Sequence, residues 1–152
     1  MFAWKVNLFS ELSAGQLYQI LKLRQDIFVL EQTCLYADLD NLDQKAVHIS
    51  LISEEFDELV GYCRILPKNT VFPEVSIGRV IVAEGSRRQG LANKVMQKAI
   101  YFINTEMDEI SIKISAQCHL QTFYKSLGFS PVSEVYDEDG IQHIDMLLEN
   151  KT

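Results

Sequence analysis

A turn with two arginines and a glycine lies between a β-branched run and a helix-like stretch, in VIVAEGSRRQGLANKVM, residues 80–96. A strand that passes into a helix through such a turn leaves backbone N–H groups unpaired at the positive end of the helix dipole. Gly90 has no Cβ to keep a phosphate away from these groups, and Arg87 and Arg88 add positive charge at the rim. The residues therefore favour an anion site. A surface turn that merely carries two arginines is the alternative.

This turn differs from two well-known phosphate loops. Neither GxxxxGK[ST] nor GxGxxG occurs in the chain, so neither a Walker loop nor a Rossmann fingerprint is present. A phosphate-bearing ligand is expected on chemical grounds, and ATP or NAD remains an open alternative at this point.

Composition limits the class of protein. The chain has 152 residues, of which 47% are hydrophobic, and a formal net charge of -7. This length and composition predict one domain over residues 1–152, and the acidic balance argues against a nucleic-acid partner. No stretch approaches the roughly 18 apolar residues of a membrane span, and no secretory signal precedes the first strand, so a cytoplasmic location and no membrane partner are expected. Three widely spaced cysteines predict free thiols and no zinc or other metal site.

Alternating strand and helix patterns indicate the elements that position this turn. Ser13 and Gln16 have the spacing of a capping box and predict the start of a helix. The strand-like runs are residues 3–8, 46–53, 58–66, 75–82, 110–116, 131–136 and 141–148. The second and third runs are expected to form a hairpin, as are the last two, around an Asp-Gly turn. The order of elements predicts an α/β protein with mixed strand directions.

A short helix is expected after the strand-like run at residues 110–116, and it carries a tyrosine on its apolar face. In FYKSLGF, residues 123–129, Gly128 has the position of a residue just past a helix end, and Phe129 is expected to contact the last turn. Tyr124 lies on the same face as Phe123 and Leu127, where a tyrosine is ordinarily part of the core.

Both motifs resemble the GNAT superfamily of acyl-CoA-dependent N-acyltransferases. Its signature is Arg or Gln, two residues, Gly, one residue, and Gly or Ala after the fourth strand. The matching residues are Arg87, Arg88, Gln89, Gly90, Leu91 and Ala92. FYKSLGF is similar to its second hallmark, a Tyr three residues short of Gly-Phe. Residues 28–40, 77–82, 116–129 and 134–144 resemble its ElaA-like branch. The resemblance implies a single domain with a mixed, mostly antiparallel sheet of about seven strands flanked by helices.

The resemblance also implies roles at the acetyl-CoA site. Arg87 to Ala92 would bind the CoA pyrophosphate, and the backbone of Val80, Ile81 and Val82 would pair with the pantetheine arm. A bulge in that strand would give a backbone N–H for the thioester carbonyl. Tyr124 would protonate the departing thiolate. Gln117 stands where many members have Asn and would reach the cofactor on a longer arm.

The acceptor amine must lose a proton, because a lysine-like amine has a pKa of about 10.4. Candidate bases are Glu31, His48 and His119, with a solvated helix-end charge and two structural histidines as the alternatives. Glu31 is preferred because it borders an acidic loop, residues 31–43, expected at the acceptor site and suited to a cationic group. His143 and Asp145 are expected to face the same cleft.

The leading interpretation is an acetyl-CoA-dependent N-acetyltransferase that acts on a primary amine of a small molecule or peptide. Direct attack through a tetrahedral intermediate is favoured over an acyl-enzyme on Cys118, because no residue pattern orients a base on that thiol. A non-catalytic CoA-binding or protein-interaction module with the same fold is the alternative, and a homodimer remains open.

Overall fold

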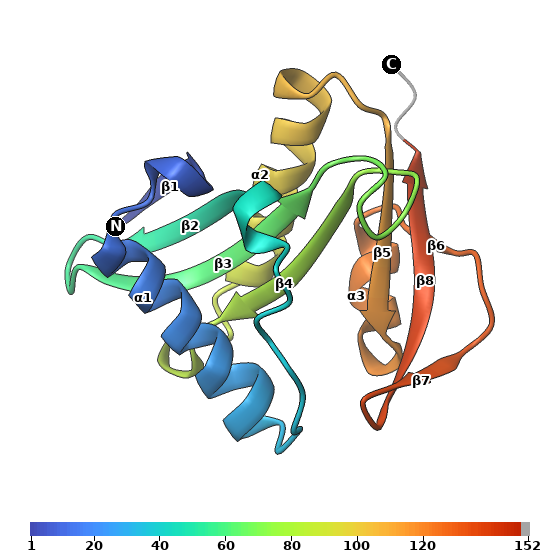
Figure 1. Ribbon diagram of the computed structural model, residues 1–152, viewed down its shortest axis with the longest axis horizontal. Helices are drawn as coiled ribbons and strands as arrows, with labels where there is room; N and C mark the ends of the chain where they lie inside the picture. The colour runs from blue at the N-terminus through green and yellow to red at the C-terminus, as the bar shows by residue number, and fades with distance from the viewer. Residues whose placement is uncertain (150–152) are drawn as a thin grey trace.

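Two antiparallel sheets form the framework of the molecule, whose computed structural model describes residues 1–149. The first sheet has the order β1 (Phe2–Leu8), β2 (Val47–Ser53), β3 (Glu58–Leu66) and β4 (Ser76–Val82). The second has the order β5 (Ser111–Gln117), β8 (Ile141–Glu149) and β6 (Ser130–Pro131), and β7 (Tyr136–Glu138) also pairs with β8. Together they make a mixed α/β single-domain fold with eight strands within residues 1–149, close to the expected number of about seven (Figure 1).

The extra strand arises where the predicted final hairpin is interrupted. Pro131 pairs with Met146, and Tyr136 pairs with His143. Four residues, 132–135, therefore cover an interval that two residues cover on β8, and the ladder breaks into β6 and β7. The Asp-Gly turn between β7 and β8 forms as expected, with positive φ at Asp139 and Gly140.

Three helices cover the sheets. The first, α1 (Ala14–Arg24), continues as a π-helical stretch (Gln25–Glu31) and lies in front of the first sheet in Figure 1, with α2 (Leu91–Glu106) behind it. The short α3 (Gln121–Ser126) lies behind β5. The Ser13–Gln16 capping box that opens α1 is present, with both reciprocal hydrogen bonds, 2.8 and 3.1 Å long.

A Schellman motif ends α3, as its sequence predicts. The Phe129 N–H donates to the Tyr124 carbonyl and the Gly128 N–H to the Lys125 carbonyl, at 3.1 and 3.0 Å. Gly128 has φ +102, and a Cβ there would lie 2.9 Å from a Leu148 methyl group. Glycine is therefore required at this position both for its conformation and for the space.

The main core lies between the two sheets and the helices α2 and α3. Apolar residues of α2 at helical spacing, namely Leu91, Val95, Met96, Ala99 and Ile103, are all buried. They pack on β-branched residues of both sheets, such as Ile65 and Ile114. This single core holds the two sheets in a fixed relation to each other.

The two sheets join at only one end of β4 and β5. The Lys113 N–H donates to the Val75 carbonyl at 2.9 Å, in an isolated parallel bridge between Val75 and Ile112. Beyond this bridge the ladder does not continue, and the C-terminal halves of β4 and β5 diverge. The divergence exposes strand backbone from both sheets to one shared space.

Candidate active site

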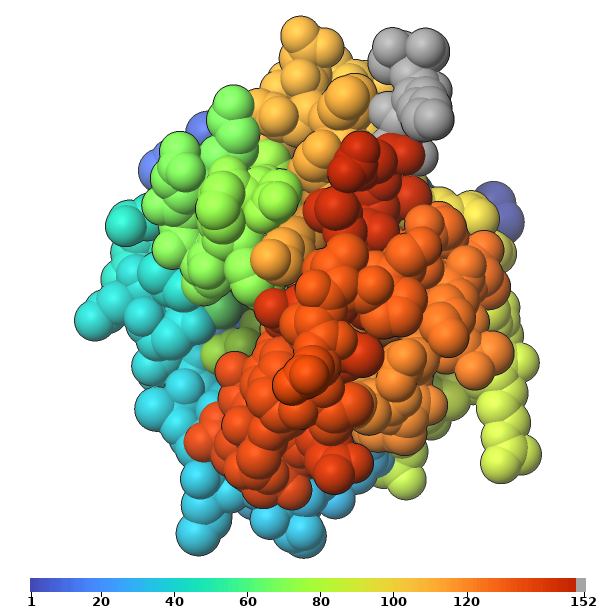
Figure 2. Space-filling model, turned by 90° about the vertical axis from the view of Figure 1, so that its right-hand side faces the viewer, coloured from blue at the N-terminus to red at the C-terminus, as the bar shows by residue number. Residues whose placement is uncertain are grey.

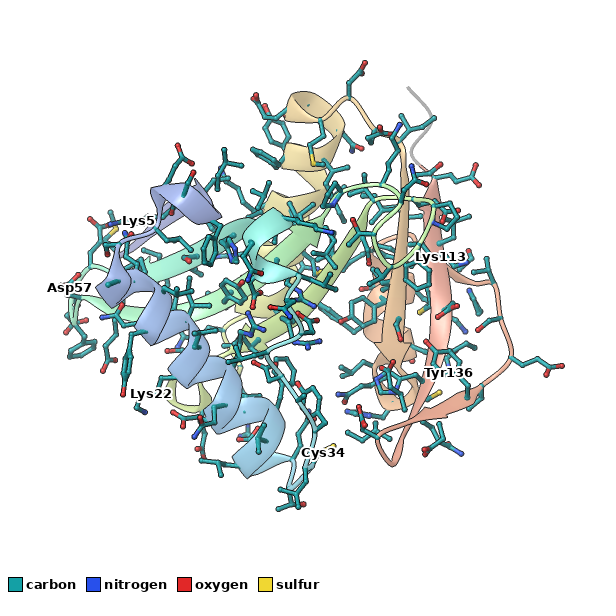
Figure 3. All side chains as sticks on the ribbon, viewed as in Figure 1. Lys5, Lys22, Cys34, Asp57, Lys113 and Tyr136 are labelled. Carbon is teal, nitrogen blue, oxygen red and sulfur yellow. The ribbon has the colours of Figure 1, made fainter. Side chains whose placement is uncertain are left out.

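A cleft of about 1150 Å³ occupies the space between the diverging strands. Its walls are β4 and the turn before α2 on one side, and β5, β7 and β8 on the other. Figure 2 shows the hollow between the cyan segment after α1, the green loop before β4 and the orange strands of the second sheet. At one place the walls meet, because the Cys34 Sγ lies 3.2 Å from the Asp139 carbonyl oxygen. Figure 3 shows Cys34 directed toward the β7–β8 turn.

A β-bulge in β4 lines this cleft. Tyr62 pairs with Ile81 and Arg64 pairs with Gly78, so Cys63 alone faces Arg79 and Val80. Arg79 has φ +51, which is unusual for a residue with a side chain and costs about 1–3 kcal/mol. The backbone at the bulge leaves the regular ladder and is free to point its groups at a molecule in the cleft.

The turn before α2 has the geometry of an anion site. Arg88 and Gly90 both have positive φ, at +67 and +71, and Gly90 is the N-cap residue of the 16-residue helix α2. The first N–H groups of a helix have no partner within it. A Cβ at Gly90 would meet no atom within 4 Å, and Gly90, Leu91 and Ala92 line the cleft, so this end of the helix is open to it. The turn can hold a phosphate group through backbone donors.

Arg87 pairs with Glu31, which ends the π-helical stretch on another wall of the cleft. Its Nη1 and Nη2 donate to the two carboxylate oxygens of Glu31 at 2.9 and 2.7 Å, and its Nε donates to the Val82 carbonyl at 3.3 Å. The hydrogen bonds to Glu31 raise the pKa of Arg87. The pair is 39% and 36% exposed, so it lies at the cleft mouth.

Tyr124 is buried and lines the cleft. Its ring packs edge-on against Phe123 and Phe129 in the main core, as the apolar pattern of α3 predicts. Within residues 1–149, no hydrogen bond reaches its hydroxyl. Burial raises the pKa of Tyr124 to about 12, so the phenol keeps its proton throughout the neutral range.

Most of the remaining residues expected at the acetyl-CoA site also line the cleft. They are Val80, Ile81, Val82, Arg88, Gly90, Leu91, Ala92 and Gln117. The Gln117 Nε2 donates to the Gln32 Oε1 at 3.4 Å, which links β5 to the segment after α1. Gln89 is exposed in the same turn and is not part of the lining.

The acidic loop does not present free carboxylates to an acceptor, contrary to the expectation from sequence. Asp38 and Asp43 accept hydrogen bonds from the fully buried Arg24, at 2.9 and 2.7 Å. Arg64 donates to Asp40 at 2.8 Å and to Asp43 at 3.0 Å. We call these five residues the buried ion cluster.

The cluster extends to the bulge. The Arg79 Nε donates to the Asp38 carboxylate at 2.8 Å, and its Nη2 donates to the Asp38 carbonyl at 2.9 Å. The guanidinium also lies 5.5 Å from the centre of the Tyr36 ring. These contacts hold the strained backbone of Arg79 in place. Arg64 and Arg79, each inside an otherwise apolar strand, are the sign of this cluster in the sequence.

The candidate bases are separated by their surroundings. His48 is fully buried away from the cleft, with Nδ1 2.6 Å from the Tyr62 hydroxyl and Nε2 2.9 Å from the Asp43 carbonyl oxygen. Burial lowers the pKa of His48, so this ring is a structural histidine. His119 is exposed at the cleft, and His143 and Asp145 line it as expected.

Cys118 packs against the main core and does not line the cleft. No group of three or more His, Cys, Asp or Glu residues within 1–149 is arranged to hold a metal ion. Over the same range, none of the helices combines the length and apolar character needed to cross a membrane.

The split sheet, the bulged β4 and the glycine turn that opens α2 form the framework of an acetyltransferase of the GNAT class. Residues 27–150 match the acetyltransferase (GNAT) domain family, and the chain belongs to this family, whose members use acetyl-CoA. The chain is 42% identical to Protein ElaA of Escherichia coli strain K12 over 149 residues, which are 98% of this chain and 97% of that protein.

Solved structures agree with this assignment. The crystal structure of Escherichia coli ElaA matches with a TM-score of 0.88 and 43% identity, covering 98% of this chain and all of that one (100%). An acyl-CoA N-acyltransferase from Pseudomonas aeruginosa matches with a TM-score of 0.91 and 34% identity, over 97% and 99% of the two chains.

Proposed function

We propose that the protein transfers an acetyl group from acetyl-CoA to a primary amine of a small molecule or peptide, by direct attack of the amine on the thioester. The observation that carries this proposal is the hydroxyl of Tyr124, which has no protein partner within residues 1–149 and lines the same cleft as the β4 bulge. An unpaired phenol and the backbone of a β-bulge on one cleft suit a reaction in which an oxyanion forms and a thiolate leaves.

The turn before α2 would hold the donor's pyrophosphate. Arg87, Arg88 and Gly90 of this turn all line the cleft, and the space around Gly90 is open. Acetyl-CoA supplies the activated acetyl group, and the edge of β4 from Val80 to Val82 supplies backbone groups for the amides of its pantetheine arm. The residues at this end of the cleft therefore fit the cofactor without a metal ion.

The bulge would polarise the thioester carbonyl. A preorganised backbone N–H is worth about 3–4 kcal/mol when it is aimed at a developing oxyanion. The Arg79 side chain, held on Asp38, keeps the bulge from relaxing into a regular strand. Tyr124 then donates its proton to the sulfur as the C–S bond breaks.

The proposal is tested by thiol release. Wild-type protein incubated with acetyl-CoA and a panel of primary amines should liberate free CoA, and Tyr124→Phe should lower kcat about 10²-fold through loss of the acid. The acetyl-CoA Kd, measured by calorimetry, should change less than about twofold, because the hydroxyl has no partner to lose.

Tyr101→Phe is the matched control, since Tyr101 is 65% exposed on α2 and does not line the cleft. Its kcat should equal the wild-type value. Acetyl-CoA binding with no thiol release from any amine would instead favour the non-catalytic CoA-binding module. Stabilisation by ATP or NAD in preference to acetyl-CoA would favour a nucleotide-binding protein.

A further inference from the structure

The wall of the cleft formed by β5, β7 and β8 carries several polar side chains, and all of them but Gln117 lie outside the expected donor site. His143 on β8 pairs with Gln117 of β5 on one side and with Tyr136 of β7 on the other. Asp145, two residues further along β8, accepts a hydrogen bond of 2.6 Å from the Tyr136 hydroxyl, which also contacts Ser115. Residues at these register positions share one face of the sheet, and all five line the cleft.

Backbone geometry fixes the tautomer of His143. Its Nδ1 lies 2.8 Å from the Ile141 carbonyl oxygen, which can only accept, so Nδ1 carries a hydrogen. In the neutral ring the lone pair is therefore on Nε2. This atom lies 3.4 Å from a carboxylate oxygen of Glu138, which would stabilise the ring after it gains a proton.

Of the other candidate bases, Glu31 and His48 have their acceptor atoms engaged, whereas His119 also lines the cleft. Both oxygens of Glu31 accept hydrogen bonds from Arg87. Both ring nitrogens of His48 have partners away from the cleft. The acidic loop is neutralised by the chain's own arginines. His143 combines a position on the cleft, a fixed tautomer and an adjacent carboxylate.

We infer that His143 is the general base that removes a proton from the ammonium group of the acceptor. This inference rests on the proposed acetyl transfer and names the group that makes the amine nucleophilic. The acceptor nitrogen starts with three protons and keeps one in the amide product. The first passes to His143 Nε2 and then to solvent, as the net proton released. The second leaves the nitrogen as the tetrahedral intermediate collapses and restores the proton that Tyr124 gives to the sulfur.

Other titratable and charged groups face His143 from the elements packed around it. Glu138 and Tyr136 approach it from β7, and the Tyr136 ring stacks on the imidazole at 6.1 Å and 24°. Asp145 lies on the same face of β8, and no cation within residues 1–149 pairs with it. The turn after β5, which contacts β8, carries the exposed His119. Two carboxylates near the imidazole favour a cationic acceptor in this part of the cleft.

The test is a pH profile of kcat/KM for His143→Asn, with acetyl-CoA and an amine from the panel that the wild-type enzyme acetylates. An asparagine amide can keep the donation to the Ile141 carbonyl but cannot accept the proton. Near pH 7, kcat/KM should fall about 10²-fold or more. The part of the wild-type pH profile that reports titration of an enzyme group should be absent from the His143→Asn profile. The loss of kcat/KM in this variant should become smaller as pH approaches the pKa of the amine. The acetyl-CoA Kd should change less than about twofold.

Gln142→Asn is the matched control, because Gln142 is the exposed neighbour on β8 and does not line the cleft. It should keep the wild-type profile. A uniform loss of kcat/KM at every pH in His143→Asn would indicate a structural role and overturn the inference. Loss of the enzyme-dependent part of the profile in His119→Asn, and not in His143→Asn, would overturn it too. Turnover by the wild type with an unchanged His143→Asn profile refutes this inference alone. No turnover with any amine refutes it together with the proposed function.

Discussion

Arginine–carboxylate contacts occur at two places around the cleft, and they differ mainly in burial. In the buried ion cluster, the Arg24 side chain is 0% exposed and those of Asp38 and Asp43 are 9% and 10% exposed. At the mouth, the Arg87 and Glu31 side chains are 39% and 36% exposed. Buried charges depend on each other because water cannot replace a lost partner, whereas exposed charges can exchange partners at little cost. The same chemistry therefore supports architecture in one place and can serve ligand binding in the other.

Removal of one residue from the buried ion cluster should have the largest effect, and this effect is on the free energy of unfolding. Arg24→Met removes the cation that contacts both Asp38 and Asp43, which are left with Arg79 and Arg64, and it should lower the free energy of unfolding by about 3–5 kcal/mol. Urea denaturation at pH 7 measures this change. Lys22→Met, which breaks the exposed Lys22–Asp26 pair on the same helix, should cost less than about 1 kcal/mol. Equal losses of unfolding free energy in Arg24→Met and Lys22→Met would contradict this difference between buried and exposed pairs.

Acid should weaken the cluster in a defined pH range. Burial alone would raise the pKa of Asp40, but its hydrogen bonds and ion pair with Arg64 outweigh burial and lower the pKa to about 2. The folded pKa is below the unfolded value of about 3.9, so the carboxylate stabilises the fold above pH 4 and loses this effect as pH falls toward 2.

Asp40→Asn tests this pH range. The difference in unfolding free energy between wild type and variant should be constant from pH 7 to 5 and then shrink by about 1–2 kcal/mol between pH 4 and 2, after allowance for solvent screening. Urea midpoints over that range give the difference at each pH. A difference that stays constant down to pH 2.5 would show that Asp40 is not held by Arg64.

Local chemistry made much of the fold predictable from sequence. The capping box at Ser13, the stop at Gly128 and the Asp-Gly hairpin each depend on residues within a few positions of one another. The signature turn at Arg87 to Ala92 is equally local. These features needed only the residues themselves to set backbone conformation.

The cluster and the proposed base depend on partners far apart in the chain. Arg24, Arg64 and Arg79 lie 14–41 residues from the aspartates that they contact. A single sequence shows each charge but not its partner, and so the acidic loop looked free. Arg64 and Arg79 within apolar strands were the available signal, because a buried charge requires a counterion. Likewise, His143 reaches the cleft only because β8 pairs with β5 and β7.

Changes at the exposed Arg87–Glu31 pair at the cleft mouth should have the smallest effect. They should alter the affinity for acetyl-CoA rather than the stability of the fold. Arg87→Ala with Arg88→Ala removes two positive charges beside the helix N-terminus and should raise the Kd of acetyl-CoA about tenfold, about 1.4 kcal/mol, without loss of the fold. Unchanged affinity would contradict the assigned role of the turn.

Glu31→Gln removes the carboxylate that competes with the phosphates for Arg87, and it should lower the Kd about two- to threefold at low salt.

The link between Glu31 and Arg87 is measured by combining these changes. If Glu31 acts through Arg87, then Glu31→Gln should have no effect on the Kd once Arg87 and Arg88 are alanine, and calorimetry of the four proteins gives the coupling energy directly. The same Glu31→Gln protein also addresses the role expected for this residue from sequence. Loss of turnover with an intact Kd would support Glu31 as the base in place of His143. Tighter binding with turnover retained would instead mean that its carboxylate regulates access of the donor's phosphates to the turn.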